Sequence, residues 1–306
     1  MSTTEQSVLS LAGRAVLLAT DGSPASAGAT HLAERLATEL HARVHTLVVL
    51  DTRGAPIPPP LDAAILIADE AVGPGVHAEQ EAAVRRGLAA TLGHEVDWPV
   101  RMGVGTPATA IVREASRIDA SMIVMGLRRH GRTDRVLNDE TTLNVIRTAP
   151  CPVLGVAPEL RQLPKRILAA IDFSNASLAA ASTARSLLPH GGRLVLAYVP
   201  PLVMFPPDDG EGVIHSLGVH AGFERASREL GADGVTVDSV VLNRELKRQI
   251  AELLVEYADT TSADLIAAGS ARLSRVDRWM LGSVSTDLVR DGHYSVLIVP
   301  PAGRRD

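Results

Sequence analysis

The amino-acid sequence predicts an α/β fold: two tandem open five-stranded parallel sheets with helices on both faces. Short runs that are apolar throughout, rather than alternating, are typical of strands covered on both faces. Between these runs, apolar residues recur at helical spacing, and the second half of the chain repeats the order of the first. Strands that alternate with helices imply right-handed crossovers and a parallel sheet.

The repeat is visible in the letters of the sequence. The segment LLATDGSPAS at 17–26 is followed 151 residues later by LAAIDFSNAS at 168–177, and each contains an aspartate, Asp21 or Asp172, after an apolar run. Nearer the ends of the halves the offset is 143, which pairs Met122–Gly126 with Leu265–Gly269. The 306 residues are about twice a typical domain of ~150 residues. We therefore predict domains at 1–158 and 164–306, joined by a linker at 157–164.

Each half contains five apolar runs and several helical patterns. The predicted strands are Ala15–Ala19, Val44–Leu50, Val96–Arg101, Met122–Met125 and Val153–Val156, then Ile167–Ile171, Leu194–Val199, Val235–Val241, Leu265–Ala268 and Val296–Val299. Helical spacing relates Leu32, Leu36 and Leu40, then Val84, Leu88 and Leu92, then Ile111, Ala115 and Ile118. Ser23-Pro24 and Thr106-Pro107 each predict a helix start, with a capping hydroxyl before proline at the first helical position.

The fold class also predicts where a ligand would bind. In open parallel sheets, ligands lie beyond the carboxyl ends of the strands, where the strand order reverses. This places Asp21 and Gly126 of the first half, and Asp172 and Gly269 of the second, at the edge that would carry a site.

Composition excludes several functions. The formal charge of −5 comes without a dense basic block, and aromatic residues make up only 3%, so we expect no nucleic-acid partner. No apolar run approaches 18 residues and the first residues lack a signal-peptide pattern, so we expect a cytoplasmic protein without a membrane partner.

Catalytic and metal-binding motifs are also missing from the sequence. Neither Lys165 nor Lys247 follows a glycine, which excludes a Walker-type phosphate loop. The single Cys151 predicts a small core residue, because it can form neither an internal disulfide nor a cysteine-based zinc site. Without zinc-type histidine spacing or a GxSxG elbow, we predict neither a metal site nor a catalytic residue.

Each half resembles a universal stress protein domain, over roughly 12–158 and 164–302. The resemblance depends on the strand-terminal Asp21 and Asp172 and on three further segments: GTPA at Gly105–Ala108, Asp264–Gly269 and APCPVL at Ala149–Leu154. It implies a Rossmann-like fold of the adenine nucleotide α-hydrolase type. Nucleotide-binding members of the family carry Gly, two residues, Gly, nine residues, then Gly-Ser or Gly-Thr, between the fourth strand and the last helix.

The second half matches this pattern with one departure. Gly269 is followed by Arg272 in place of the second glycine, and then by Gly282-Ser283. Glycines let the backbone approach phosphates, and a helix that begins at Gly-Ser attracts anions with its free amides. Arg272 could block the phosphates or hold them. The resemblance implies that Asp172 and Val199 hold base and sugar, and that Gly269, Gly282, Ser283 and Ser285 contact phosphates. The alternative is a structural turn and helix cap without a ligand.

The first half departs further from the pattern. The constant offset gives Gly126, then Arg129, then Asp139-Glu140 in the Gly-Ser position. Two carboxylates suit a helix N-terminus but would repel a triphosphate. A register that slides by two residues would instead align Gly131 and Thr142 with the pattern. We predict a degenerate first site, in which Asp21 either faces the base and sugar end, as the resemblance implies, or holds the turn that follows it.

Both halves also share a set of charged residues at the same offset. Arg129, Arg132, Asp134 and Arg135 correspond to Arg272, Arg275, Asp277 and Arg278. They could handle an anion or form a solvated loop with local ion pairs.

The sequence and the resemblance together predict a stress-response or regulatory protein whose second domain binds an adenine nucleotide, foremost ATP with Mg²⁺. The first domain would be a degenerate partner, and the two last strands would pair within the chain as a pseudo-dimer, with a homodimer left open. We expect that the protein is not an enzyme, and slow ATP hydrolysis is a third, less favoured reading. The alternative function is an interaction or scaffold module of the same fold that binds no nucleotide.

Overall fold

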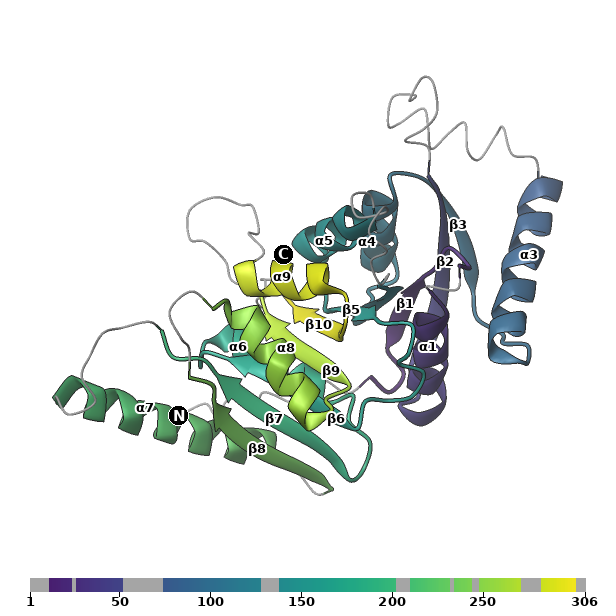
Figure 1. The fold of residues 1–306 in the computed structure, drawn as a ribbon. Coiled ribbons are helices and arrows are strands. Elements are labelled where there is room, and N and C mark those ends of the chain that lie inside the picture. The colour runs from purple at the N-terminus through teal and green to yellow at the C-terminus, as the bar shows by residue number, and fades with distance from the viewer. Residues whose placement is uncertain are drawn as a thin grey trace, which may run out of the picture. The chain divides into compact units, whose positions relative to one another are not determined.

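The computed structural model describes residues 11–23, 26–51, 74–127, 138–201, 210–231, 234–243, 248–270 and 282–300. Contacts between residues divide the chain into two compact units. The first unit comprises residues 11–162, and the second begins at Leu163. Each unit is an α/β structure in its own right and is described separately (Figure 1).

The elements of the two units follow the same order. In the first unit they are β1 (Ala15–Ala19), α1 (Ala27–Glu39), β2 (Arg43–Asp51), α3 (Pro74–Leu92), β3 (Val100–Gly105), α4 (Pro107–Arg117), β4 (Met122–Gly126), α5 (Asn138–Thr148) and β5 (Val153–Val156). In the second unit they are β6 (Arg166–Ile171), α6 (Asn175–Arg185), β7 (Gly192–Tyr198), α7 (Gly210–Leu230), β8 (Val235–Val241), α8 (Ile250–Thr261), β9 (Leu265–Gly269), α9 (Ser283–Asp291) and β10 (Ser295–Val299).

The described strands of each unit form a parallel sheet. The first unit has the order β3-β2-β1-β4-β5, and the second has β10-β9-β6-β7-β8. The chain therefore moves outward from β1 to β3, then returns to add β4 and β5 on the other side of β1. The second unit repeats this path around β6 and β9. The order thus reverses between β1 and β4, and between β6 and β9, as the fold class predicted.

Helices cover both faces of each sheet. In the first unit α1 packs with α3 and α4 packs with α5, and in the second α6 packs with α7 and α8 with α9. Right-handed crossovers that run in opposite directions along a sheet place their helices on opposite faces. In each unit, one of these helix pairs therefore covers one face of the sheet and the other pair covers the opposite face. In Figure 1, α8 and α9 lie in front of the second sheet, with which they are in contact.

The core of each unit consists of the central strands and the helices on them. Every residue of β1, β5 and β10 is buried, as are Met122–Met125 of β4 and Leu265–Ala268 of β9. This burial from both faces confirms the reading of the uniformly apolar runs as strands of a doubly covered sheet. Burial also raises the pKa of Cys151 to about 12, so its thiol stays protonated at neutral pH, as a core residue.

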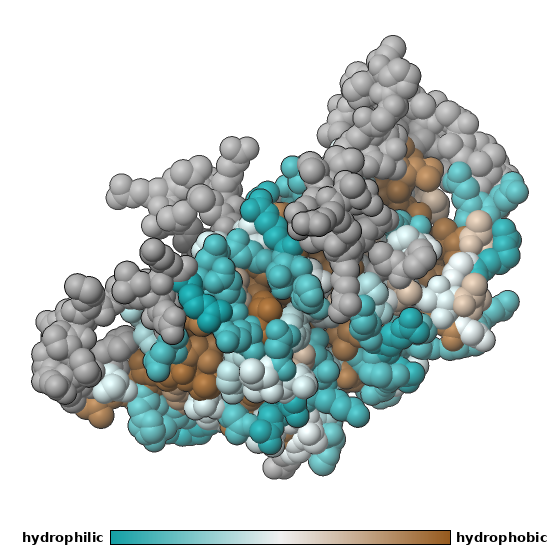
Figure 2. All heavy atoms as spheres, in the orientation of Figure 1, coloured by the Kyte–Doolittle hydropathy of each residue, from teal (hydrophilic) through white to brown (hydrophobic). Residues whose placement is uncertain are grey.

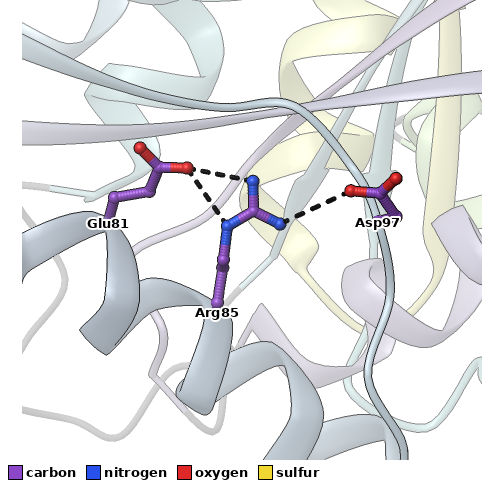
Figure 3. Close-up of polar contacts among 3 residues, drawn as sticks. All are labelled: Glu81, Arg85 and Asp97. Atoms are coloured by element: carbon purple, nitrogen blue, oxygen red, sulfur yellow. Dashed lines mark hydrogen bonds and ion pairs between the residues drawn. The ribbon is translucent and has the colours of Figure 1, made fainter. Parts of the chain in front are cut away.

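The structure corrects the start of the third strand. The sequence predicted Val96–Arg101, but β3 begins at Val100 and pairs with β2 from Thr46 onward. The Pro99 carbonyl accepts a hydrogen bond from the Thr46 amide at 2.8 Å. Because Pro99 has no amide to donate in return, the strand pairing begins one residue later, at Val100. The preceding Asp97 is exposed and lies 4.0 Å from Arg85 of α3, which also bonds Glu81 (Figure 3).

The predicted helix starts are only partly correct. Helix α1 begins at Ala27, and its N-cap is Ser26 rather than Ser23, because the Ser26 amide and hydroxyl both donate to the Ser23 carbonyl and close a turn first. Helix α4 begins at Pro107 with Thr106 as its N-cap, as predicted. The Thr106 side chain, however, makes no capping hydrogen bond. In the described part of the chain, no helix has the length and apolar character needed to cross a bilayer.

A hydroxyl in the first sheet yields a stability prediction. Thr46 is 1% exposed, and its Oγ1 has no hydrogen-bond partner among the described residues. We expect Thr46→Val to raise the free energy of unfolding by about 1 kcal/mol, because valine has the same shape without the desolvated hydroxyl. Thr183→Val is the matched control: the Thr183 hydroxyl donates to the Ala179 carbonyl at 2.8 Å, so this change should be destabilising. Urea unfolding of both variants measures the difference, and a destabilised Thr46→Val would contradict the prediction.

The contact between α1 and the segment after β5 yields a second prediction. A Cβ on Gly28 would lie 2.5 Å from the Ala157 carbonyl oxygen, which is backbone and cannot swing aside. We expect Gly28→Ala to cost about 1–3 kcal/mol through overpacking. Gly87→Ala in α3, where the added carbon would meet no described atom beyond the neighbouring backbone of its own helix, should stabilise by up to about 1 kcal/mol. Equal effects of the two changes on the thermal midpoint would refute the packing argument.

Candidate functional site

The predicted aspartates lie where the strand order reverses. Asp172 directly follows β6, which pairs with β9, and Asp21 follows β1, which pairs with β4, after one intervening residue. Each carboxylate accepts a hydrogen bond from the amide two residues later: Ser174 donates to Asp172 Oδ1 and Ser23 donates to Asp21 Oδ1, both at 2.9 Å. Both aspartates therefore hold the turn that leads from the first strand to the first helix of their unit.

Around Asp172, this turn is tied to the first turn of α6. The Asp172 amide donates to Ser177 Oγ at 3.2 Å, and that hydroxyl donates to the Ser174 carbonyl at 3.0 Å. Ser174 is the N-cap of α6, and its side chain accepts from the Ser177 amide. Partial desolvation raises the pKa of the Asp172 carboxyl, but hydrogen bonds from Ser174 and Ser177 outweigh it and hold the pKa below its ordinary value. Asp172 is therefore a fixed, exposed carboxylate at neutral pH.

Three aromatic rings gather beside Asp172, a feature that sequence reasoning missed. Phe173 lies 5.3 Å, between ring centroids, from Tyr198 at the end of β7 and 5.3 Å from Phe223 of α7. Burial raises the pKa of Tyr198, and the nearby Asp172 carboxylate raises it further, so the phenol lies within electrostatic reach of that aspartate. In the same part of the second unit, beside the carboxyl ends of β7 and β8, Figure 2 shows an apolar area. The side chains of Phe173, Tyr198 and Phe223 are called the aromatic cluster below.

Gly269 has a packing role that the sequence did not predict. A Cβ on Gly269 would lie 2.6 Å from the carbonyl carbon and oxygen of Ala176 and 2.8 Å from the Ser177 amide nitrogen. The end of β9 therefore touches the backbone of the first turn of α6, and only glycine permits this approach. Gly269 lets the end of β9 lie against the first turn of α6, whether or not a ligand is present.

Helix α9 provides the amide end that the motif predicted. Gly282 is its N-cap, Ser283 is its first residue, and no side chain caps it among the described residues. The first amides of a helix have no partner within it and attract anions. The Ser283 side chain is exposed, whereas Ser285 is 2% exposed. Ser283 is thus the more accessible of the two hydroxyls, and Ser285 contributes mainly to packing.

The first unit differs at the corresponding place. Helix α5 begins at Asn138, so Asp139 and Glu140 both lie in its first turn, and the Glu140 side chain is exposed. This is where the sequence placed the two carboxylates. Thr142 lies in the following turn and is 4% exposed, so the register that slides by two residues does not bring its hydroxyl to the helix N-terminus. Gly126 ends β4, as predicted.

Several predicted residues lie outside the described part of the chain. They include Arg129 and Arg272, the two residues that replace the second glycine of the motif, and the remaining members of the shared charged set, at 132–135 and 275–278. Val199 is described and follows β7 directly, next to Tyr198 of the aromatic cluster. In the second unit, the structure thus brings Asp172, Gly269 and the start of α6 together at the sheet edge.

One signal in the sequence could have revealed the aromatic cluster. At the offset of 151 the residue after the aspartate is Gly22 in the first half and Phe173 in the second. Both residues adopt a left-handed conformation, with φ of 70° and 63°. Glycine adopts it readily, but a bulky side chain does so rarely, so a phenylalanine at this position must be held there by its surroundings.

Comparisons with known proteins agree with the repeated fold. The model of the universal stress protein family matches residues 13–157 and again residues 164–300. Universal stress proteins of Mycobacterium tuberculosis and Mycobacterium bovis are 25% identical over 292 residues, which covers 89% of this chain and 94% of each relative.

Solved structures that match nearly the whole chain share the fold. A universal stress protein of Archaeoglobus fulgidus superimposes with a TM-score of 0.63 at 19% identity, over 94% of this chain and 98% of the other. One from Pseudomonas aeruginosa gives 0.59 at 15% identity, over 95% and 94%. The chain belongs to the universal stress protein family and contains the family's domain twice in tandem.

Proposed function

We propose that the second unit binds an adenine nucleotide, foremost ATP, and that the protein is a nucleotide-dependent regulator rather than an enzyme. The observation that carries the proposal is the start of α9 at Gly282-Ser283. Apart from its chain neighbours, no described atom lies within 4 Å of the position that a Cβ on Gly282 would take, so the described residues give this glycine no packing reason comparable to that of Gly269. A close approach of phosphate to the helix amides would account for it.

The described residues fit such a ligand. The amide end of α9 suits the phosphates, and Asp172, fixed at the end of β6, suits hydroxyl or amino donors of sugar and base. Val199 and the neighbouring aromatic cluster provide apolar surface near the carboxylate. No group of three or more metal-binding side chains occurs among the described residues. Mg²⁺ would therefore be held mostly by the phosphates and water, as is usual for nucleotide complexes.

A scaffold without a nucleotide is the second candidate, and one observation favours it. The missing side chain of Gly269 is explained by its contact with Ala176 and Ser177 alone, so this glycine of the motif needs no ligand. In that case the two units would act through their surfaces. Pairing of the last strands β5 and β10 within the chain belongs to both functions and stays a prediction.

Substitution at Gly282 separates the candidates. Aspartate and asparagine are equally good helix N-caps and have the same size, so Gly282→Asp and Gly282→Asn differ only in charge. We expect wild type to bind MgATP, and Gly282→Asp to bind it at least about tenfold more weakly than Gly282→Asn, because the new carboxylate faces the phosphates. Isothermal titration of the full chain measures both constants, and extraction of the purified protein reveals any nucleotide that it retains.

The outcomes of this experiment are distinct. Wild type without retained nucleotide and without heat at millimolar ATP would favour the scaffold. Equal affinities of the two variants would mean that the phosphates do not lie at α9. Release of ADP during the titration would instead identify slow hydrolysis, which the proposal does not include.

The first unit provides a test by gain of function. We expect Asp139→Gly with Glu140→Ser to create a second, weaker ATP site, because it removes two negative charges and restores the Gly-Ser of the motif. Since α5 begins at Asn138, the glycine lies inside its first turn and should cost about 1 kcal/mol of helix stability. Circular dichroism must confirm that the variant is folded. Asp139→Asn with Glu140→Gln is the control that removes charge alone, and a folded variant with no second site would refute the repulsion argument.

A further inference from the structure

We propose that Phe173 is a positioning residue of the second-unit site: its ring wedges against α7 at Gly222 and thereby holds the turn that presents Asp172. The wedge itself is a property of the fold. Only the ligand that Asp172 would meet depends on the proposed function. The inference follows from the backbone conformation of Phe173, the contacts of its ring, and the hydrogen bonds that the turn makes.

The backbone of Phe173 is in an unfavourable conformation. Its φ of 63° lies in the left-handed region, where a side chain crowds the carbonyl that follows it and reduces the population of the conformation by roughly tenfold. Such a conformation persists only when the surrounding structure enforces it. In the first unit, Gly22 makes the equivalent turn with a φ of 70° and needs no such support.

The ring contacts supply the enforcement. Phe173 packs edge-on against Phe223, with an interplanar angle of 81°, and tilted by 37° against Tyr198. Phe223 and Tyr198 are each 8% exposed and therefore fixed in the core. On α7, a Cβ at Gly222 would lie 2.8 Å from two carbons of the Phe173 ring, so the ring occupies space that only glycine leaves open. A change of backbone conformation at Phe173 would withdraw the ring from this gap.

The same turn carries the hydrogen bonds of Asp172. The Ser174 amide, which donates to Asp172 Oδ1, belongs to the peptide that follows Phe173. Rotation about the backbone of Phe173 would turn this amide away from the carboxylate, and Asp172 would lose the partner that fixes it. The wedge therefore connects α7 with the functional carboxylate, while in the first unit Gly22 makes the equivalent turn without a side chain to wedge.

Three variants test the wedge. Phe173→Leu keeps a side chain in the left-handed conformation but loses the aromatic packing, so the turn should relax. Phe173→Gly removes both the wedge and the strain, so the turn should persist as it does at Gly22. Gly222→Ala should displace the ring and act like Phe173→Leu. The readout is the pKa of Asp172 in the full chain, measured by NMR titration of its carboxyl carbon. The Asp172→Asn variant assigns the resonance.

The expected pattern is specific. In wild type and Phe173→Gly the pKa of Asp172 lies below its ordinary value, and in Phe173→Leu and Gly222→Ala it rises toward that value. Gly222→Ala should have no effect on Asp172 when Phe173 is already glycine, because the ring that it would displace is gone. If the Phe173 ring only stabilised the fold, Phe173→Leu would lower the stability without changing the pKa of Asp172. An unchanged pKa in Phe173→Leu, or an effect of Gly222→Ala that persists without the ring, would overturn the proposal.

Binding of ATP to the same variants separates this inference from the proposed function. If wild type binds MgATP, its affinity should fall about tenfold in Phe173→Leu and Gly222→Ala, because both leave a side chain in the left-handed conformation without the ring contacts that enforce it. In Phe173→Gly the affinity should stay within about threefold of wild type, because glycine adopts this conformation readily. If wild type does not bind ATP, the proposed function fails. The NMR pattern then still decides whether Phe173 positions Asp172.

Discussion

The central strands of each unit, β1 beside β4 and β6 beside β9, are buried from both faces, and the rest of the structure depends on this burial. Apart from Arg166 at the start of β6, whose guanidinium donates to the Thr261 carbonyl at the end of α8, the side chains on these strands serve packing, since helices cover both surfaces. Polar chemistry is therefore confined to the edge where the strands end and their backbone leaves the ladder. Asp21 and Asp172 occupy that edge because it is the first position at which a carboxylate can reach both solvent and free amides.

The sequence predicted the parts of the fold that depend on the burial pattern along the chain. Uniformly apolar runs located the strands to within a few residues, and the repeat placed the two aspartates at equivalent edges. Errors arose where local hydrogen bonding decides a boundary: Pro99 delays β3, and the turn between Ser23 and Ser26 delays α1. The sequence marked Phe173 by its contrast with Gly22 but not its two aromatic partners, because the three residues are far apart in sequence and come together only in the folded unit, where α7 packs with α6. For the same reason the role of Gly269 became clear only from its contact with α6.

The two units have kept one architecture and diverged at one edge. Their sheets have equivalent strand orders, and in the first turn of each an amide donates the same hydrogen bond to the aspartate carboxylate. They differ in how that turn is stabilised, by glycine in one and by packing in the other. They differ again at the last helix: α5 begins at Asn138 and α9 at Ser283, a difference of 145 residues against the constant offset of 143 in the neighbouring strands. At the constant offset, α5 therefore begins two residues earlier than α9, and Asp139 is one of the two added residues.

The contact of Gly269 with the backbone of α6 changes how well each glycine of the motif indicates nucleotide binding. A glycine that the fold itself requires is under the same constraint in a binding domain and in one that has ceased to bind, so its presence carries little information about ligands. Gly282 meets no such backbone in the described part of the chain, so no described contact would oppose its replacement once binding no longer mattered. The first copy within this chain shows that distribution: Gly126 is retained at the end of β4, whereas Asp139 occupies the place of Gly282. Under the proposed function, the glycine at the start of the last helix is thus the better marker of the nucleotide-binding unit in this chain.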